Sequence, residues 1–392
     1  MKSNVKKSII GFFILIGVLA NWVTFAEALD VKLLWKKEFR YKVKRIDFAT
    51  GSGDVLVALK GKDEGVGKEL ILFDKGGNER FHWGPRLDRR AGPITISKDG
   101  EYFGFVTGYT ESYASKKGVH VGSDDKFHFY DRQTKKEVWN LDEVSGGSPQ
   151  IFPDGSSVII YGYESGMFWI YNQQGKLIFK QDQQTRGIKY LEISPDSSHF
   201  ALVRESSGLL TLYKRDGTKL WEKGRHREGI ASITDGASYI SANPYFLGPS
   251  STPDSINSQN GTVYDKTGNK VMEGLGVLSG NGSRIAMFYP DKVTVLNWPG
   301  KSMVKEIMMD MRELFETSTE SHTRFSYDGR YLFLKSGKSI VAYDLLENTK
   351  KEITIPEMVE YPEFYITEDG KYLLINPQEP EATKILYFYQ VY

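Results

Sequence analysis

The apolar residues of this chain stand in short runs separated by small polar turns, most often Asp-Gly. A typical unit reads Ile94-Thr-Ile-Ser, then Asp99-Gly100, then a second apolar run. Asp, Asn and Gly tolerate the positive φ angles that tight hairpins need, so the pattern predicts antiparallel strand pairs. Equivalent turns recur at positions 54, 99, 154, 196, 235, 281, 328 and 369, about 45 residues apart.

A second turn signal follows within almost every unit, for example at residues 130–134, 171–175, 213–217 and 264–268. Each unit therefore contains two hairpins, which give four strands, A to D. Four-stranded sheets repeated around an axis are typical of β-propellers. We expect an all-β, eight-bladed β-propeller with four-stranded antiparallel blades. Seven blades is the alternative, if residues 232–241 in the weak fifth unit form no strand pair.

The two ends of the repeat region complement each other. The last unit has strand patterns near Phe364, Tyr372 and residues 385–391, and no fourth strand. The segment Val31-Lys-Leu-Leu-Trp35 has no A, B or C strand before it, and it is similar to the D strands of other units. We expect this N-terminal strand to complete the last blade, which leaves no open sheet edge between the first and last blades.

Residues 1–28 have the order of features of a secretory signal peptide. Three lysines precede an apolar run at residues 9–20, and Ala26-Glu27-Ala28 supplies the small residues of a cleavage site. The run is shorter than the roughly 20 residues that span a bilayer. We therefore expect a signal peptide over 1–28, a single propeller domain over 29–392, and export to the periplasm or the cell exterior with no membrane span after cleavage. An uncleaved anchor is the alternative.

Composition narrows the function further. The chain has no cysteine, which excludes disulfides, thiolate metal sites and a lipidated cysteine. Residues 29–392 carry 48 basic and 49 acidic side chains, so no global field attracts nucleic acid. No nucleotide-binding or nucleophile-elbow motif occurs, and none of the six histidines has metal-ligand spacing. His82 and His128 lie in strand patterns and are expected to be packed or half-exposed. We expect no cofactor, no metal site and no catalytic residues.

Two segments carry a resemblance to known propellers: Tyr130-Asp-Arg-Gln-Thr-Lys-Lys-Glu-Val-Trp139 and Tyr213-Lys-Arg-Asp-Gly-Thr-Lys-Leu-Trp221. They resemble the repeats of bacterial exported PQQ-like propellers and of WD40-like and YVTN-like propellers. The resemblance covers about residues 30–392 and implies the fold, whereas function does not follow from fold. One PQQ-like protein is a lipoprotein scaffold of outer-membrane protein assembly, and this chain departs from it by lacking the lipidated cysteine.

The long insertions are expected on one face of the propeller. Residues 60–68, 108–125, 243–260 and 376–383 are B–C connections, and residues 303–323 form a D–A connection. These connections leave the same face, whereas the A–B and C–D turns on the other face stay short. Long loops on a rigid scaffold often carry binding sites. Drift in loop length on a tolerant surface is the alternative.

Two candidate sites fall on that loop-rich face. Arginines and a histidine in inter-blade loops could converge on an anion; they are Arg86, Arg89, Arg90, Arg186, Arg225, His226 and Arg227. Residues 303–315 have the apolar spacing of an amphipathic helix that could dock a partner, through Met303, Ile307, Met308, Met311, Leu314 and Phe315. Independently solvated charges, and a helix packed on the propeller rim, are the alternatives.

The leading hypothesis is a non-enzymatic exported module that binds or scaffolds another envelope or secreted protein through its loop-rich face. The alternative is a propeller enzyme or carbohydrate-binding protein that acts on an anionic glycan or small anion at the channel mouth. In that case His226 would serve as general base and the arginines would bind the substrate's charge. A deep pocket where these side chains converge favours the enzyme, and a shallow apolar patch favours the scaffold.

Overall fold

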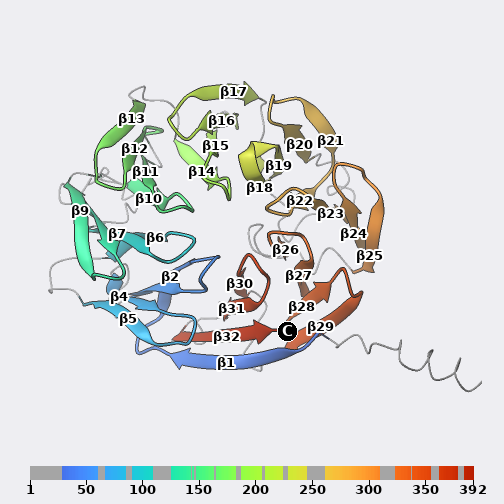
Figure 1. The fold of residues 1–392 in the computed structure, drawn as a ribbon, viewed down its shortest axis with the longest axis horizontal. Coiled ribbons are helices and arrows are strands. Elements are labelled where there is room, and N and C mark those ends of the chain that lie inside the picture. Colours follow the sequence, from blue (N-terminus) through green and yellow to red (C-terminus); the bar gives the residue numbers. More distant parts are fainter. Residues whose placement is uncertain are drawn as a thin grey trace, which may run out of the picture.

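The computed structural model describes residues 29–60, 67–84, 91–108, 125–142, 144, 147–162, 165–181, 187–204, 208–223, 228–244, 261–309, 323–336, 338–354, 362–377 and 384–392. Within them, eight four-stranded antiparallel sheets form a ring around a central axis (Figure 1). The chain is therefore an all-β, eight-bladed propeller, as expected, and the seven-blade alternative is wrong.

Each blade runs from an inner strand A to an outer strand D. The first four blades are β2 (Val43–Phe48), β3 (Val55–Lys60), β4 (Gly67–Phe73), β5 (Glu79–Trp83); β6 (Ala91–Ile96), β7 (Tyr102–Thr107), β8 (Lys126–Asp131), β9 (Lys136–Asp142); β10 (Gly147–Ile151), β11 (Ser157–Gly162), β12 (Phe168–Asn172), β13 (Leu177–Gln181); and β14 (Ile188–Ile193), β15 (His199–Arg204), β16 (Leu210–Lys214), β17 (Lys219–Lys223).

The remaining blades are β18 (Glu228–Ile233), β19 (Tyr239–Pro244), β20 (Thr262–Asp265), β21 (Lys270–Glu273); β22 (Gly276–Leu278), β23 (Arg284–Tyr289), β24 (Lys292–Asn297), β25 (Met303–Met308); β26 (Thr323–Phe325), β27 (Tyr331–Ser336), β28 (Ser339–Asp344), β29 (Thr349–Thr354); and β30 (Glu363–Ile366), β31 (Tyr372–Asn376), β32 (Ile385–Val391), β1 (Val31–Glu38). A 3₁₀ turn, η1 (Asp235–Ala237), joins β18 to β19.

The eighth blade is closed by the N-terminal strand. β1 pairs antiparallel with β32 from Val31 opposite Val391 to Glu38 opposite Ile385 (Figure 1). Trp35 of β1 stacks on Phe388 of β32 with ring centroids 4.9 Å apart and planes 2° from parallel. The two ends of the described chain therefore share one sheet, as the sequence predicted.

The fifth blade forms despite its weak sequence pattern. β18 and β19 pair from Glu228 opposite Pro244 to Ile233 opposite Ile240, with a register shift between Ile230 and Ser232. Ile233 and Ile240 are buried in the core shared with blade 4. Burial of these two positions between neighbouring sheets therefore compensates for the serines and alanines in this pair.

The core lies between the blades. Along β3, Val55, Val57 and Leu59 pack against blade 8, while Leu56 and Ala58 pack against blade 2. Alternate side chains of a strand point to opposite faces of its sheet, so a strand covered on both faces is apolar throughout. The D strands cover the outside and are half-exposed, which explains their alternating polar and apolar residues.

Aromatic residues of the D strands interlock neighbouring blades. The Nε1 of Trp35 donates to the Lys75 carbonyl at 3.1 Å, that of Trp139 to Gln173 at 3.0 Å, and that of Trp221 to Lys266 at 2.9 Å. In each case the acceptor belongs to the C–D turn of the next blade. A glycine of the same turn lies against the ring, and these glycines are Gly77, Gly175 and Gly268. The repeated turn glycine and D-strand tryptophan in the sequence are therefore contact partners in adjacent blades.

Gly217 makes the tightest of these approaches. Its φ is +87°, and a Cβ at this position would lie 2.2 Å from the ring of Phe179 in the preceding blade. We expect Gly217→Ala to lower the free energy of unfolding by about 2 kcal/mol, because the substitution adds backbone strain and a steric clash. Urea denaturation followed by tryptophan fluorescence measures the effect. Gly300→Ala is the matched control in the C–D turn of blade 6, where a Cβ meets no atom within 4 Å. Equal effects of the two substitutions would contradict the interlock.

The helix expected at residues 303–315 is wrong for its first half. Met303–Met308 form β25, the D strand of blade 6, paired with β24 from Leu296 opposite Met303 to Lys292 opposite Met308. Backbone pairing with β24 completes the four-stranded sheet, and this tertiary contact overrides the helical spacing of the apolar residues. Met303 and Met308 are 66% and 68% exposed, whereas Ile307 is buried in the core. Met311, Leu314 and Phe315 lie outside the described residues.

Candidate functional site

The A–B turns form a hydrogen-bonded ring around one end of the central axis. In six of the eight turns a Ser or Thr side chain accepts the N–H five residues later, as Ser97 does from Tyr102 at 3.0 Å. In five of these it also donates to the turn Asp or Asn, as Ser97 does to Asp99 at 2.6 Å. Such side-chain bonds fix the turn without help from a neighbour. Ser-x-Asp-Gly and its close variants therefore build similar turns in blades 2, 4, 6, 7 and 8, whereas the turns of blades 1 and 3 begin with Ala49 and Phe152.

Successive turns are joined between blades by hydrogen bonds. Backbone bonds link the turns of blades 1–2, 2–3, 5–6, 6–7, 7–8 and 8–1; the donor and acceptor pairs are Gly51 and Lys98, Lys98 and Pro153, Asp235 and Gly280, Asn281 and Tyr327, Tyr327 and Glu368, and Glu368 and Thr50. The two junctions of blade 4 use side chains instead. The Ser197 hydroxyl accepts the Asp154 N–H at 2.9 Å, and the Asp196 carboxylate accepts the Gly236 N–H at 2.8 Å. The ring is therefore closed.

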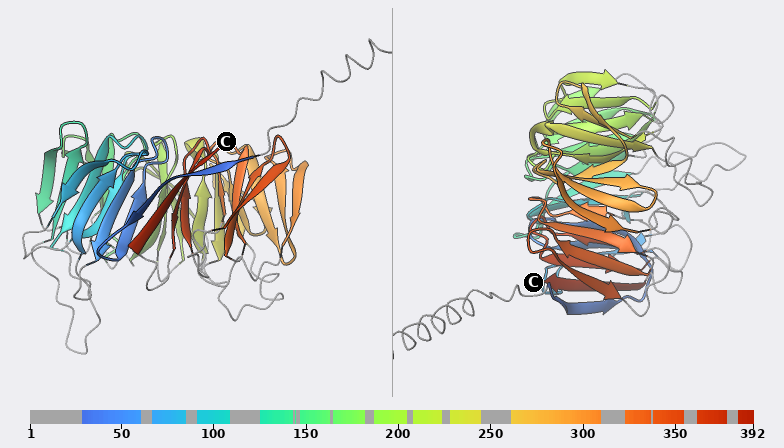
Figure 2. Two further views of the ribbon diagram at one scale, coloured as in Figure 1. Left: turned by 90° about the horizontal axis from the view of Figure 1, so that it is seen from below. Right: turned by 90° about the vertical axis from the view of Figure 1, so that its right-hand side faces the viewer.

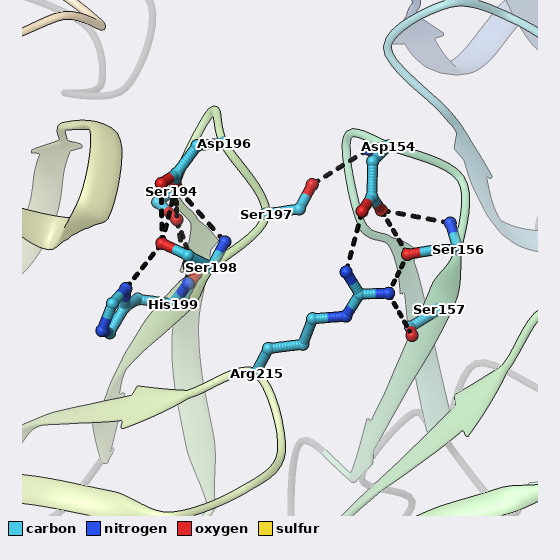
Figure 3. A network of polar contacts seen from close by, with 9 residues as sticks. All are labelled: Asp154, Ser156, Ser157, Ser194, Asp196, Ser197, Ser198, His199 and Arg215. Carbon is cyan, nitrogen blue, oxygen red and sulfur yellow. Dashed lines mark hydrogen bonds and ion pairs between the residues drawn. The ribbon is translucent and has the colours of Figure 1, made fainter.

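Blade 4 is further tied to blade 3 by Arg215 (Figure 3). This residue of the C–D turn places its Nη1 2.8 Å from the Asp154 carboxylate, and its Nη2 is 3.0 Å from the Ser157 hydroxyl. Within blade 4, the Ser198 hydroxyl bonds both the Asp196 carboxylate and His199 Nδ1, at 2.8 and 2.7 Å. The hydroxyl lies between carboxylate and imidazole, whereas an activated nucleophile needs the imidazole in the middle. This network therefore stabilises the turn.

Side chains also connect blades that are not neighbours. Lys98 Nζ lies 2.6 Å from the Glu368 carboxylate and 5.5 Å from the centre of the Tyr327 ring. The Tyr327 hydroxyl in turn donates to Asp235, and this hydrogen bond, followed by burial, raises the pKa of Tyr327 to about 12. These contacts join the turns of blades 2, 5, 7 and 8 at the A–B end of the axis. A cavity of about 450 Å³ remains beside them, lined by turn residues of blades 1–4.

Among the described carboxylates, Asp47 has the pKa that is raised furthest above its ordinary value. It lies on β2, where its Oδ2 accepts the Ile96 N–H of blade 2 at 2.8 Å. Burial raises the pKa of Asp47 to about 7, against the opposing effect of hydrogen bonds from Ile96, Phe48 and Thr95. The group therefore changes charge near neutral pH in the folded protein.

This raised pKa predicts a pH-dependent stability. Between about pH 4 and 7 the folded state holds a proton on Asp47 that the unfolded chain has released, so stability falls as pH rises through that window. Asp47 keeps a small exposed fraction, so we discount the full shift and expect a loss of about 2 kcal/mol. Asp47→Asn should remove this loss, which urea titrations at pH 5 and pH 8 would measure. If the stability of Asp47→Asn changes between the two pH values as much as that of the native protein, Asp47 is not the group responsible.

A hydroxyl–imidazole–carboxylate relay lies in blade 2, and sequence spacing did not indicate it. Thr107 Oγ1 is 2.9 Å from His128 Nε2, and His128 Nδ1 is 2.8 Å from the Glu137 carboxylate. The order matches that of catalytic triads, but Thr107 is 1% exposed and the imidazole stacks on Phe105. A buried hydroxyl cannot attack a substrate, so the relay satisfies polar groups within the blade. His128 is partly buried and His82 half-exposed, which confirms the expectation for both.

The residues expected to bind an anion lie outside the described part of the chain. They are Arg86, Arg89, Arg90, Arg186, Arg225, His226 and Arg227. Their convergence stays a prediction, and with it the anionic-glycan alternative. Among the described residues, no group of three or more His, Asp or Glu side chains is placed to hold a metal ion. The described part of the chain contains no helix with the length and apolar character needed to cross a bilayer.

The fold is similar to that of a known propeller, although sequence comparison finds no relative. No family model matches the chain, and no curated protein matches it. Among solved structures, the chain is similar to BamB from Moraxella catarrhalis, with a TM-score of 0.55 and 11% sequence identity. The match covers 92% of this chain and 100% of that chain. At this identity the likeness shows the propeller fold alone.

Proposed function

We propose that this chain is a non-enzymatic, exported module that binds or scaffolds another envelope or secreted protein through its B–C/D–A face. The proposal rests on how connection lengths divide between the two faces. Each A–B and C–D connection within a blade contains four to six residues. The B–C and D–A connections range from 2 to 18 residues, and the three longest join β7 to β8, β19 to β20, and β25 to β26.

The structure of the opposite face supports this division. The A–B turns are tied into a hydrogen-bonded ring, and side chains such as Lys98, Tyr327 and Glu368 connect blades at that end. The antiparallel strands place the A–B turns at one end and the B–C connections at the other (Figure 2). A closed ring holds the B–C strand ends in fixed positions, so a partner that binds there loses little additional ordering entropy.

The repeats resemble those of PQQ-like propellers, one of which is a scaffold of outer-membrane protein assembly, and this resemblance supports the proposed binding role. The likeness to BamB agrees with that reading at the level of the fold. Four groups of charged or polar side chains among the described residues serve internal contacts: the turn ring, the Arg215 network, the Lys98–Tyr327 group and the Thr107 relay. Rigid presentation of loops is therefore the mechanism that we propose.

Replacing the two longest B–C connections tests this proposal. Residues 109–124 and 245–260 are each replaced by a short Gly-Ser linker in a protein that begins at residue 29. The native chain and the loop variant are each crosslinked to the envelope fraction of the native cell. Any partner protein captured in this way is then purified, and its affinity for the native chain and for the loop variant is measured by titration. We expect specific binding by the native chain, loss of binding by the loop variant, and an unchanged thermal midpoint. Lys176→Glu on the A–B/C–D face is the control and should bind normally. Binding that survives loop replacement would overturn the proposal.

A further inference from the structure

The A–B/C–D face carries a groove of about 870 Å³ over blade 1, where three blades meet. The A–B turns of blades 1 and 8 and the C–D turns of blades 1 and 2 form its walls. Its lining residues are mostly polar: Gly51, Ser52, Asp54, Asp74, Lys75, Gly76, Arg80, Arg132, Gln133, Lys135, Asp369, Lys371 and Tyr372. The volume lies in the range of small-molecule sites.

Two of the five cations in the groove are held by carboxylates from the same lining. Arg132 of blade 2 forms an ion pair with Asp54 of blade 1, whose side chain is 4% exposed. Arg80 likewise pairs with Asp74. A guanidinium has five N–H donors, and an ion pair through one nitrogen leaves others available. Both arginines are thereby fixed in place with spare donor capacity toward the groove.

The three lysines have no ion-pair partner within the described part of the chain. Lys135 and Lys371 are exposed residues on opposite walls, in the C–D turn of blade 2 and the A–B turn of blade 8. Lys75 lies between them in the C–D turn of blade 1, with its Nζ 5.5 Å from the centre of the Tyr372 ring. The lysines therefore present ammonium groups from three different turns.

The carboxylates of the groove are committed to internal donors. Asp74 Oδ1 accepts the N–H groups of Gly76 and Asn78, each at 2.9 Å. Asp369 Oδ1 accepts the Thr367 hydroxyl at 2.6 Å and the Lys371 N–H at 3.0 Å. Asp54 is bound to Arg132. Among the described residues no donor reaches Asp369 Oδ2, which stays available as an acceptor, but the lining has five basic and three acidic side chains, so donors predominate.

We infer that this groove binds a small polyanion, a molecule the size of a phosphorylated or carboxylated sugar with at least two separated anionic groups. One anionic group would lie between Lys75 and Lys371, and the other near Lys135 and Arg132. Charge-assisted hydrogen bonds from ammonium and guanidinium groups favour phosphate and carboxylate oxygens, and donors on several turns favour a ligand with more than one anion. The site uses none of the arginines that the sequence analysis predicted for the loop-rich face, and its test is independent of partner binding there.

Isothermal titration calorimetry of the protein from residue 29 tests this inference, with pyrophosphate, citrate and a galacturonate trisaccharide as probes. We expect one probe to bind and Lys135→Gln/Lys371→Gln to weaken that affinity about tenfold, because two charge-assisted contacts are lost. Raising the salt from about 20 to 200 mM should weaken binding by screening. Binding of pyrophosphate alone would identify phosphate as the ligand's anionic group, whereas binding of citrate or the galacturonate trisaccharide would identify carboxylate.

The control variant is Lys176→Gln/Lys350→Gln, which removes the same charge from exposed lysines outside the groove. The affinity of this control variant for the probe should stay within about twofold of the native value, because salt screens the electrostatic effect of these distant charges on the groove. Both variants should unfold at the native temperature, since all four lysines are exposed. Equal weakening by the two variants, or the absence of heat with every probe, would overturn the inference.

Discussion

Deleting residues 29–38 is expected to lower the free energy of unfolding by about 4 kcal/mol or more. The deletion removes β1, which pairs with β32 over seven residues, and with it the stacking of Trp35 on Phe388. Leu29 is also lost from the core between blades 7 and 8. An unpaired β32 becomes an exposed sheet edge, and we expect dimers or larger aggregates as well.

Urea denaturation and size-exclusion chromatography measure both consequences, against a control protein that begins at residue 29. A synthetic peptide of residues 29–38, added in excess, should restore the urea midpoint of the shortened protein, because the missing strand can bind in trans. A shortened protein that is monomeric and as stable as the control would show that closure by β1 contributes little to the ring.

Arg330→Ala is expected to cost about 2–3 kcal/mol of stability, the largest effect that we expect of a single substitution. Arg330 Nε and Nη2 donate to Asp344 Oδ2 at 3.0 and 2.7 Å, and the Asp344 side chain is 4% exposed. Removing the guanidinium leaves a buried carboxylate with only the N–H groups of Leu346 and Glu347. This expected loss of stability is smaller than for a fully buried ion pair, because the Arg330 side chain is itself 39% exposed.

The same pair gives a pH signature. Burial acts to raise the pKa of Asp344, but Arg330 and the two N–H groups outweigh it, so the pKa is lowered. A lowered pKa means that the stabilisation is present above about pH 4 and is lost as pH falls through the folded-state pKa. The stabilities of the native and Arg330→Ala proteins should therefore converge at low pH.

Lys292→Ala is the matched control for this prediction. It removes an ion pair with Glu306 at 2.7 Å in which the two side chains are 32% and 40% exposed, so neither partner becomes a buried charge and the urea midpoint should not change measurably. Equal destabilisation by the two substitutions, or a difference that persists at pH 2, would contradict the account of Asp344.

The fold was predictable because its signal is local and repeated. Each Asp-Gly turn fixes a hairpin, and the missing fourth strand at residues 385–391 indicated the pairing with Val31 to Trp35 that the structure confirms. Residues 303–308 were predicted wrongly for the opposite reason. Their apolar spacing fits a helix, and only the neighbouring strand β24 makes them a strand. Pairing with a neighbour is tertiary information that periodicity does not contain.

The sites were less predictable than the fold. Lys75, Lys135 and Lys371 are far apart in the sequence, and the groove exists only because C–D turns of two blades meet an A–B turn of a third. The Thr107–His128–Glu137 relay likewise depends on the register of β7, β8 and β9. Neither set has a spacing that indicates its chemistry. The contacts between D-strand tryptophans and turn glycines were also hidden, because Trp35, Trp139 and Trp221 each contact a glycine of the next blade at a different separation along the chain.

Site-specific photo-crosslinking tests the central claim, that a partner protein binds the B–C/D–A face, most directly. Benzoylphenylalanine replaces Tyr289 at the end of β23 or Lys338 in the B–C turn of blade 7, both on the B–C side, and Lys176 or Leu346 in C–D turns on the opposite face. All four are exposed residues. After irradiation with the native envelope fraction, we predict that one protein is crosslinked at Tyr289 or Lys338 and not at Lys176 or Leu346. Crosslinks confined to Lys176 and Leu346 would contradict the claim.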